Sequence, residues 1–77
     1  MENVNFYFEN TQGNHSKFWA VSIQESSKND WIVLRRWGKI GDNGRTMQER
    51  FFSYRDAKKL RDSLIMDKER KGYCPIL

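Results

Sequence analysis

One segment in the middle of the chain combines an aromatic ring with several cations. It contains Arg35, Arg36, Trp37, Lys39, Arg45 and Arg50. An indole ring can stack on a base or a sugar, while Arg and Lys side chains hold the flanking phosphates. This combination predicts a nucleic-acid-binding surface. The alternative is that Trp37 belongs to the core or its rim, because tryptophan is highly buried on average.

The remaining reactive side chains do not form a recognisable catalytic set. His15 stands in a Gly- and Asn-rich stretch with no acidic residue within four positions. Cys74, the single cysteine, has no base near it in sequence and cannot close an intramolecular disulfide. The carboxylates alternate with Lys and Arg, as solvated ion pairs do. We therefore expect no catalytic residue, no metal site and no cofactor.

Three glycines follow the tryptophan at equal spacing. Gly38, Gly41 and Gly44 resemble a phosphate-binding loop only superficially, because the Gly-Lys-Ser/Thr ending is missing. No helix pattern follows them directly either. The spacing favours a hairpin loop that needs positive φ angles.

The positive charge is concentrated in the second half of the chain. The formal net charge is +4 with a sequence pI near 9.5. Residues 1–34 carry a net −2 and residues 35–77 a net +6. Such an excess suits a polyanionic partner, although a solvated basic surface would look the same by composition.

Alternating side chains predict four strands, at 4–8, 18–24, 31–37 and 45–52. In the second strand, Trp19, Val21 and Ile23 fall on one face, which we expect to be core, and the other face should be wet. The same alternation places Arg35 on the face of Trp37 and Arg36 on the opposite face. Arg35 is therefore the stronger candidate of the two for a shared site.

A helix is predicted after the fourth strand. Ser53 is suited to be its N-cap, Asp56 favours its first turn and Gly72 is a natural stop. Ala57, Leu60 and Leu64, with Tyr54 and Ile65 beside them, form its apolar arc.

These elements predict an α+β fold: one small domain over residues 1–77, with its core at about 4–73. An antiparallel sheet of about four strands carries one carboxy-terminal helix across a face. Residues 1–3 and 74–77 are expected to be loose ends.

Several stretches together resemble the WGR domain. They are Lys17–Ile23 (KFWAVSI), Trp31–Trp37 (WIVLRRW), Trp37–Gly41 (WGKIG) and Asp67–Tyr73 (DKERKGY). The resemblance covers about residues 4–73. The family is named for a Trp-Gly-Arg triplet at the end of a central strand, and it occurs in DNA-dependent poly(ADP-ribose) polymerases and in short bacterial modules.

The resemblance implies a role for individual residues. The motif tryptophan, which matches Trp37, packs against a nucleotide sugar at a DNA end while nearby basic residues touch the backbone. The motif arginine links the domain to its neighbours in those enzymes, and Lys39 replaces it here. Lysine keeps the charge but loses the planar fork. No ADP-ribosyltransferase segment is present in these 77 residues, so neither catalysis nor its control is implied.

Two functions follow as expectations. The first is a non-enzymatic module that binds nucleic acid, DNA rather than RNA. Its contacts are Trp37, Lys39, Arg35 and Arg45, followed by Arg36 and Arg50. The second is a protein-interaction or regulatory adaptor that uses the same Trp/Arg surface, since interface hot spots favour these residues.

The expected location follows from missing signals. No apolar run approaches the 18 residues that a membrane helix needs, and the first residues lack a signal region. We expect a cytoplasmic protein, nucleoid-associated if bacterial, with no membrane partner and no small-molecule substrate.

Overall fold

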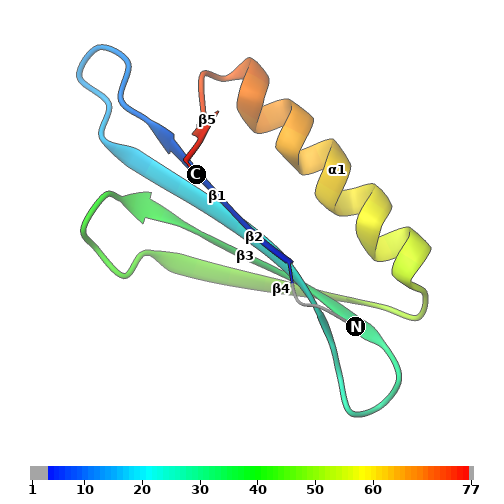
Figure 1. Cartoon of the computed structure of the whole chain (residues 1–77). Coiled ribbons are helices and arrows are strands. Elements are labelled where there is room, and N and C mark those ends of the chain that lie inside the picture. Colours follow the sequence, from blue (N-terminus) through cyan, green and yellow to red (C-terminus); the bar gives the residue numbers. More distant parts are fainter. Residues whose placement is uncertain (1–3, 77) are drawn as a thin grey trace.

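The computed structural model describes residues 4–76. Its elements in chain order are β1 (Val4–Asn10), β2 (Lys17–Glu25), β3 (Trp31–Lys39), β4 (Arg45–Phe51), α1 (Tyr54–Arg70) and β5 (Cys74–Pro75). They form one antiparallel sheet in the order β4-β3-β2-β1-β5, and α1 crosses one of its faces (Figure 1). The predicted α+β architecture is confirmed, with one strand more than expected.

The additional strand lies where a loose end was expected. Cys74 and Pro75 pair with Glu9 and Phe8 of β1, and the Ile76 N–H donates to the Tyr7 carbonyl at 3.0 Å. The chain reaches β1 because it reverses at Gly72, whose φ is +99°. Two residues are too few to show a side-chain period. The expected loose ends 1–3 and Leu77 lie outside the described residues.

The hydrophobic core lies between α1 and the sheet. It contains Phe8, Trp19, Val21, Ile23, Val33 and Ala57. The predicted inward face of β2 is thus confirmed. Leu60 and Leu64 of α1 pack against this cluster while remaining partly exposed, so the predicted helix arc is also confirmed.

The helix-free face is not uniformly wet, which corrects the expectation. Phe18 and Ser22 on this face are only 2% and 5% exposed. Tyr7 stacks on Phe18 at 5.8 Å between ring centroids, and the Arg36 guanidinium lies 5.1 Å from the same ring. Neighbours from β1 and β3 therefore cover Phe18, although no helix does.

Both ends of α1 are capped as the sequence predicts. The Ser53 hydroxyl accepts the Asp56 N–H at 3.1 Å, which satisfies one free donor of the first turn. At the other end, the Tyr73 N–H donates to the Lys68 carbonyl and the Gly72 N–H to the Glu69 carbonyl. This pair of bonds is a Schellman motif, and it turns the chain back toward β1.

The β3–β4 hairpin loop is shorter than predicted, because β3 continues through Gly38 to Lys39. Gly41 and Gly44 have positive φ angles of 97° and 79°. A Cβ on Gly44 would come within 2.3 Å of the Trp37 carbonyl oxygen. The hairpin therefore closes tightly beneath the backbone of Trp37.

Candidate nucleic-acid interface

The strand register shows which side chains lie around Trp37. Some of them were predicted as site residues and others were not. Trp37 of β3 lies opposite Trp19 of β2 and Arg45 of β4. Two residues further on, Lys39 lies opposite Lys17. Side chains alternate along a strand, so all five stand on the helix-covered face. Two lysines directly opposite each other weaken a sheet, and folding alone gives no reason for them.

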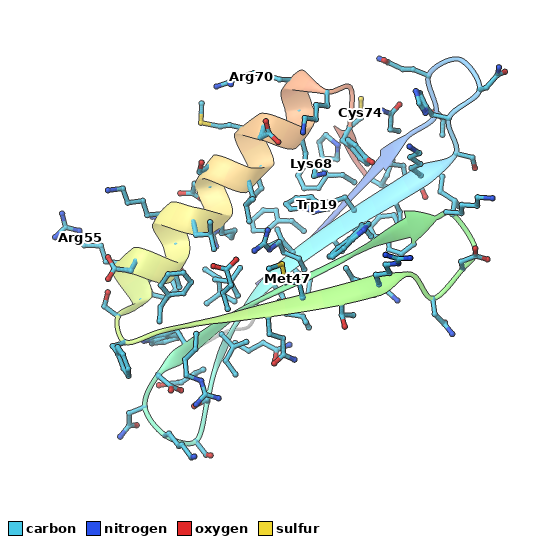
Figure 2. The ribbon with its side chains drawn as sticks, turned by 180° about the vertical axis from the view of Figure 1, so that it is seen from behind. Trp19, Met47, Arg55, Lys68, Arg70 and Cys74 are labelled. Atoms are coloured by element: carbon cyan, nitrogen blue, oxygen red, sulfur yellow. The ribbon has the colours of Figure 1, made fainter. Side chains whose placement is uncertain are left out.

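A groove opens beside Trp37, between the last turns of α1 and the strands β3 and β4. Its volume is about 350 Å³. Its lining residues are Trp19, Arg35, Trp37, Met47, Leu64, Asp67 and Lys68. Trp37 is half-buried, so its ring packs against the core and also borders the groove. Figure 2 shows Lys68 and Trp19 facing each other between helix and sheet, with Met47 on the outer strand.

Lys68 is held over aromatic rings. Its ammonium group lies 5.8 Å from the Trp19 ring and 5.3 Å from the Tyr73 ring. Burial lowers its pKa from 10.5, and the positive charges of Lys71, Arg35 and Lys17 lower it further, against the opposing effect of Asp67. The pKa is therefore lowered first by burial and second by the cations gathered at this end of the groove.

The Arg35 side chain is more buried than expected for a residue that contacts a ligand at the surface. It forms an ion pair with Glu49, and its side chain is 17% exposed. Its Nε is buried and has no hydrogen-bond partner. Arg35 does share the face of Trp37, as the alternation predicts, but its charge is opposed by Glu49.

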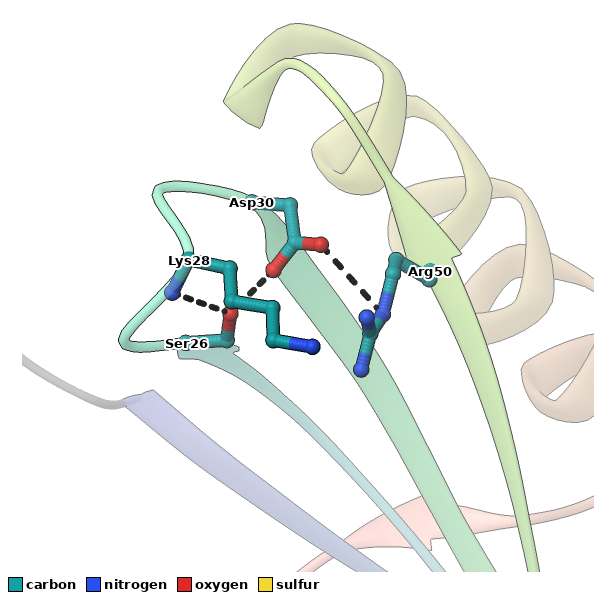
Figure 3. A network of polar contacts seen from close by, with 4 residues as sticks. All are labelled: Ser26, Lys28, Asp30 and Arg50. Atoms are coloured by element: carbon teal, nitrogen blue, oxygen red, sulfur yellow. Dashed lines mark hydrogen bonds and ion pairs between the residues drawn. The ribbon is translucent and has the colours of Figure 1, made fainter.

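The structure does not bring Arg36 and Arg50 to this groove. Arg36 stands on the helix-free face, where its Nη1 donates to the Asn43 carbonyl at 3.5 Å. Arg50 lies at the far end of β4, and its Nε is 3.3 Å from the Asp30 carboxylate. Asp30 is 5% exposed and also accepts the Ser26 hydroxyl (Figure 3). The loop between β2 and β3 thus contains a buried carboxylate.

Sequence reasoning missed Lys17 and Lys68 as members of this surface. Lys17 alternates with Trp19 and so shares its face. Lys68 follows Leu64 by one helical turn and so continues the apolar arc of α1. Both signals are present in the sequence, but only the register and the helix position show that they converge on Trp37.

Other chemistry is sparse in the described residues. His15 and Cys74 are both exposed. Within residues 4–76 no three His, Cys, Asp or Glu side chains gather as metal ligands would. The described helix is also too short and too polar to cross a membrane.

Comparisons with known proteins place the chain in a family. The model of the WGR domain matches residues 2–76. An uncharacterized Sinorhizobium fredii protein, y4dW, is 36% identical over 62 residues, which cover 80% of this chain and 30% of that protein. Human protein mono-ADP-ribosyltransferase PARP3 is 25% identical over 65 residues, covering 84% of this chain and 12% of that protein.

A solved structure agrees in fold. The crystal structure of a Bacteroides fragilis protein superposes with a TM-score of 0.80 at 31% identity, over 96% of this chain and 20% of that one. The chain thus spans less than a third of each of these relatives. Because the family model covers nearly all of the sequence, this chain belongs to the WGR domain family.

Proposed function

We propose that this WGR domain is a non-enzymatic module that binds DNA in preference to RNA, with Trp37 at the centre of the contact. Membership of a family of binding domains supports a general role in nucleic-acid binding. The resemblance to DNA-dependent polymerases supports the preference for DNA. The observation that carries the proposal is the half-buried Trp37 with Lys17, Lys39 and Arg45 around it.

Each side chain has a distinct task in this proposal. The accessible part of the Trp37 ring packs on a sugar or base, which tolerates different sequences. Lys17 and Lys39 bind one stretch of phosphates, whose charge relieves their mutual repulsion. Arg45 holds the backbone on the other side of the ring.

The remaining predicted contacts are subordinate. Arg35 pairs with Glu49 and supports the floor of the groove beneath Trp37. Arg36 lies on the other face and Arg50 is held by Asp30. We expect substitution of Arg36 or Arg50 to reduce affinity less than substitution of Lys39 or Arg45.

The test compares two tryptophans of the same strand. Trp31 is also half-buried on the helix-covered face, where it packs on Tyr54 at 5.0 Å between centroids, but at the opposite end of β3. Trp37→Ala should weaken binding to a short DNA duplex about 5- to 150-fold, the range of one lost stacking contact. Trp31→Ala should lose stability without a comparable loss of affinity. Equal affinities of both variants, with both folded by circular dichroism, would contradict the proposal.

A protein partner is the second candidate, because Met47, which lines the groove, is 47% exposed. Titration at two salt concentrations separates the two functions. Phosphate contacts weaken steeply as salt rises, whereas apolar docking changes little. Parallel titrations with RNA of the same sequence test the preference for DNA.

A further inference from the structure

The two edges of the sheet differ in how they are protected. The β5 edge has two residues and ends in Pro75, which offers no N–H to another strand. The β4 edge is seven residues long, contains no Pro, Gly or Lys, and pairs only with β3 in the described part of the chain. The β4 edge is therefore the longer uncovered edge that another strand can join.

The alternation of hydrogen bonds along the sheet shows which backbone groups of β4 point outward, away from β3. The Ile40 N–H donates to the Ser16 carbonyl at 3.1 Å, one position beyond the Lys17–Lys39 pair. Bonded and non-bonded pairs alternate in an antiparallel ladder, so the β3 residues with odd numbers bond toward β4. Their partners on β4 have odd numbers too. The outward N–H and C=O groups of β4 are consequently those of Thr46, Gln48 and Arg50.

Exposed apolar side chains accompany this edge. In the described part of the chain, the exposed large hydrophobic side chains are Met47, Phe52, Met66 and Ile76. Met47 lies in β4, and Phe52, which is 90% exposed, follows it directly. Met47 would lose contact with water if a strand paired here.

We propose that β4 is a homodimer interface, at which β4 of a second copy pairs in antiparallel orientation about a two-fold axis at Gln48. The outward backbone groups of the two strands then face each other and can form hydrogen bonds. Thr46 pairs with Arg50 of the second copy, Gln48 with Gln48, and Arg50 with Thr46. Arg45 faces Phe51, and Met47 faces Glu49. No like charges face each other, and Arg45 lies diagonal to Glu49 of the second copy.

Other registers are less favourable. A one-residue shift places Arg45 opposite Arg50. It also sets each outward-pointing residue opposite a residue whose backbone groups point back to its own β3, so the hydrogen bonds between the two copies cannot form. Centring the axis on Glu49 places two carboxylates face to face, and centring it on Met47 leaves the Arg50–Phe51 ends unpaired. Only the axis at Gln48 pairs the whole strand, aligns the outward hydrogen-bonding groups of both copies and keeps like charges apart.

The dimer also has a consequence for shape. A two-fold axis normal to the sheet keeps both copies of α1 on the same face, so the two Trp37 grooves open on one side of a continuous sheet. Because Arg45 faces Phe51, the first turn of α1 of the second copy lies next to each groove. This inference does not depend on what the groove binds.

The test joins the two copies at the proposed axis. In a Cys74→Ser background, Gln48→Cys should form a disulfide-linked dimer under mild oxidation, because a directly opposite pair lies within disulfide reach. Thr46→Cys is the matched control. Two copies of position 46 would be about 13 Å apart along the strands, beyond disulfide reach. Cross-linking of both variants alike, or of neither, contradicts this register.

Sedimentation velocity tests the association itself. From about 5 to about 500 µM, the wild type should pass from monomer toward dimer. Gln48→Pro removes an outward N–H without breaking the β3–β4 ladder and should remain monomeric, whereas Gln48→Ala keeps the N–H and should dimerise. Unchanged circular dichroism confirms that Gln48→Pro is folded. A wild type that stays monomeric over the whole range overturns the proposal and leaves the role of Trp37 unaffected.

Discussion

At the scale of single residues, Lys68 shows how this small domain keeps a cation inside its groove. Lys68 is half-buried, and its ammonium group lies over the rings of Trp19 and Tyr73. Ring faces compensate part of the lost hydration, while the neighbouring cations oppose the charge.

The lowered pKa of Lys68 makes stability depend on pH. Between that pKa and 10.5, the unfolded chain binds more protons than the folded protein, so the free energy of unfolding rises with pH there. Lys68→Met lacks this contribution. We expect the difference in unfolding free energy, wild type minus Lys68→Met, to increase when urea melts are moved from about pH 8 to about pH 10. A difference that stays constant or decreases would show that the groove does not disfavour the charged form.

At the scale of elements, the β3–β4 hairpin positions the tryptophan. Gly41 and Gly44 both have positive φ, but their surroundings differ. Nothing lies within 4 Å of a Cβ on Gly41, whereas a Cβ on Gly44 would meet the Trp37 carbonyl and the Phe18 ring. Gly44 therefore connects the turn to the backbone that carries Trp37.

This contrast gives a matched pair of substitutions. Gly41→Ala should cost about 1–2 kcal/mol, the penalty of a left-handed alanine. Gly44→Ala adds a steric clash and should cost about 1–3 kcal/mol more. Chemical denaturation measures both. Since the clash displaces Trp37, Gly44→Ala should also reduce DNA affinity more than Gly41→Ala, and equal effects on stability and affinity would argue against the close contact.

At the scale of the whole molecule, the domain is elongated, with a longest extent of 42 Å. The loops at 11–16 and 40–44 and the end of α1 lie at the same end of the fold (Figure 1). At this end lie Lys17 of β2, Lys39 of β3 and Lys71, which is the C-cap of α1. The other end holds the β2–β3 loop, where Asp30 neutralises Arg50.

The proposed phosphate contacts predict how the affinity for DNA responds to salt. If Lys17, Lys39 and Arg45 each neutralise one phosphate, each change to Gln should lower the log–log salt slope on duplex DNA by about 0.9. Lys28→Gln is the control, since this exposed lysine lies in the loop at the opposite end. Sequence preference should not change. A slope unaltered in the triple variant would exclude this end as the phosphate-binding surface.

Much of the fold could be predicted because it depends on local patterns. The alternation of Trp19, Val21 and Ile23, the cap at Ser53 and the stop at Gly72 each act within a few residues. The separation of Arg35 from Arg36 followed from the same period of two. The strands β1 to β4, the helix and its buried face were therefore accessible from the sequence.

Contacts between distant segments required the tertiary structure. Three features depend on which elements meet in the folded chain. They are the pairing of β5 with β1, the burial of Phe18 on the helix-free face and the Arg35–Glu49 ion pair. The six candidate residues were grouped because they lie close together in the sequence. In the folded chain they are distributed over both faces and both ends of the sheet. By itself the sequence determined the strands β1 to β4, the helix α1 and the faces of β2 and α1 that form the core, because these follow from neighbouring side chains. Only the tertiary structure decided which cations surround Trp37, because strand register and helix placement are set by packing across the whole domain.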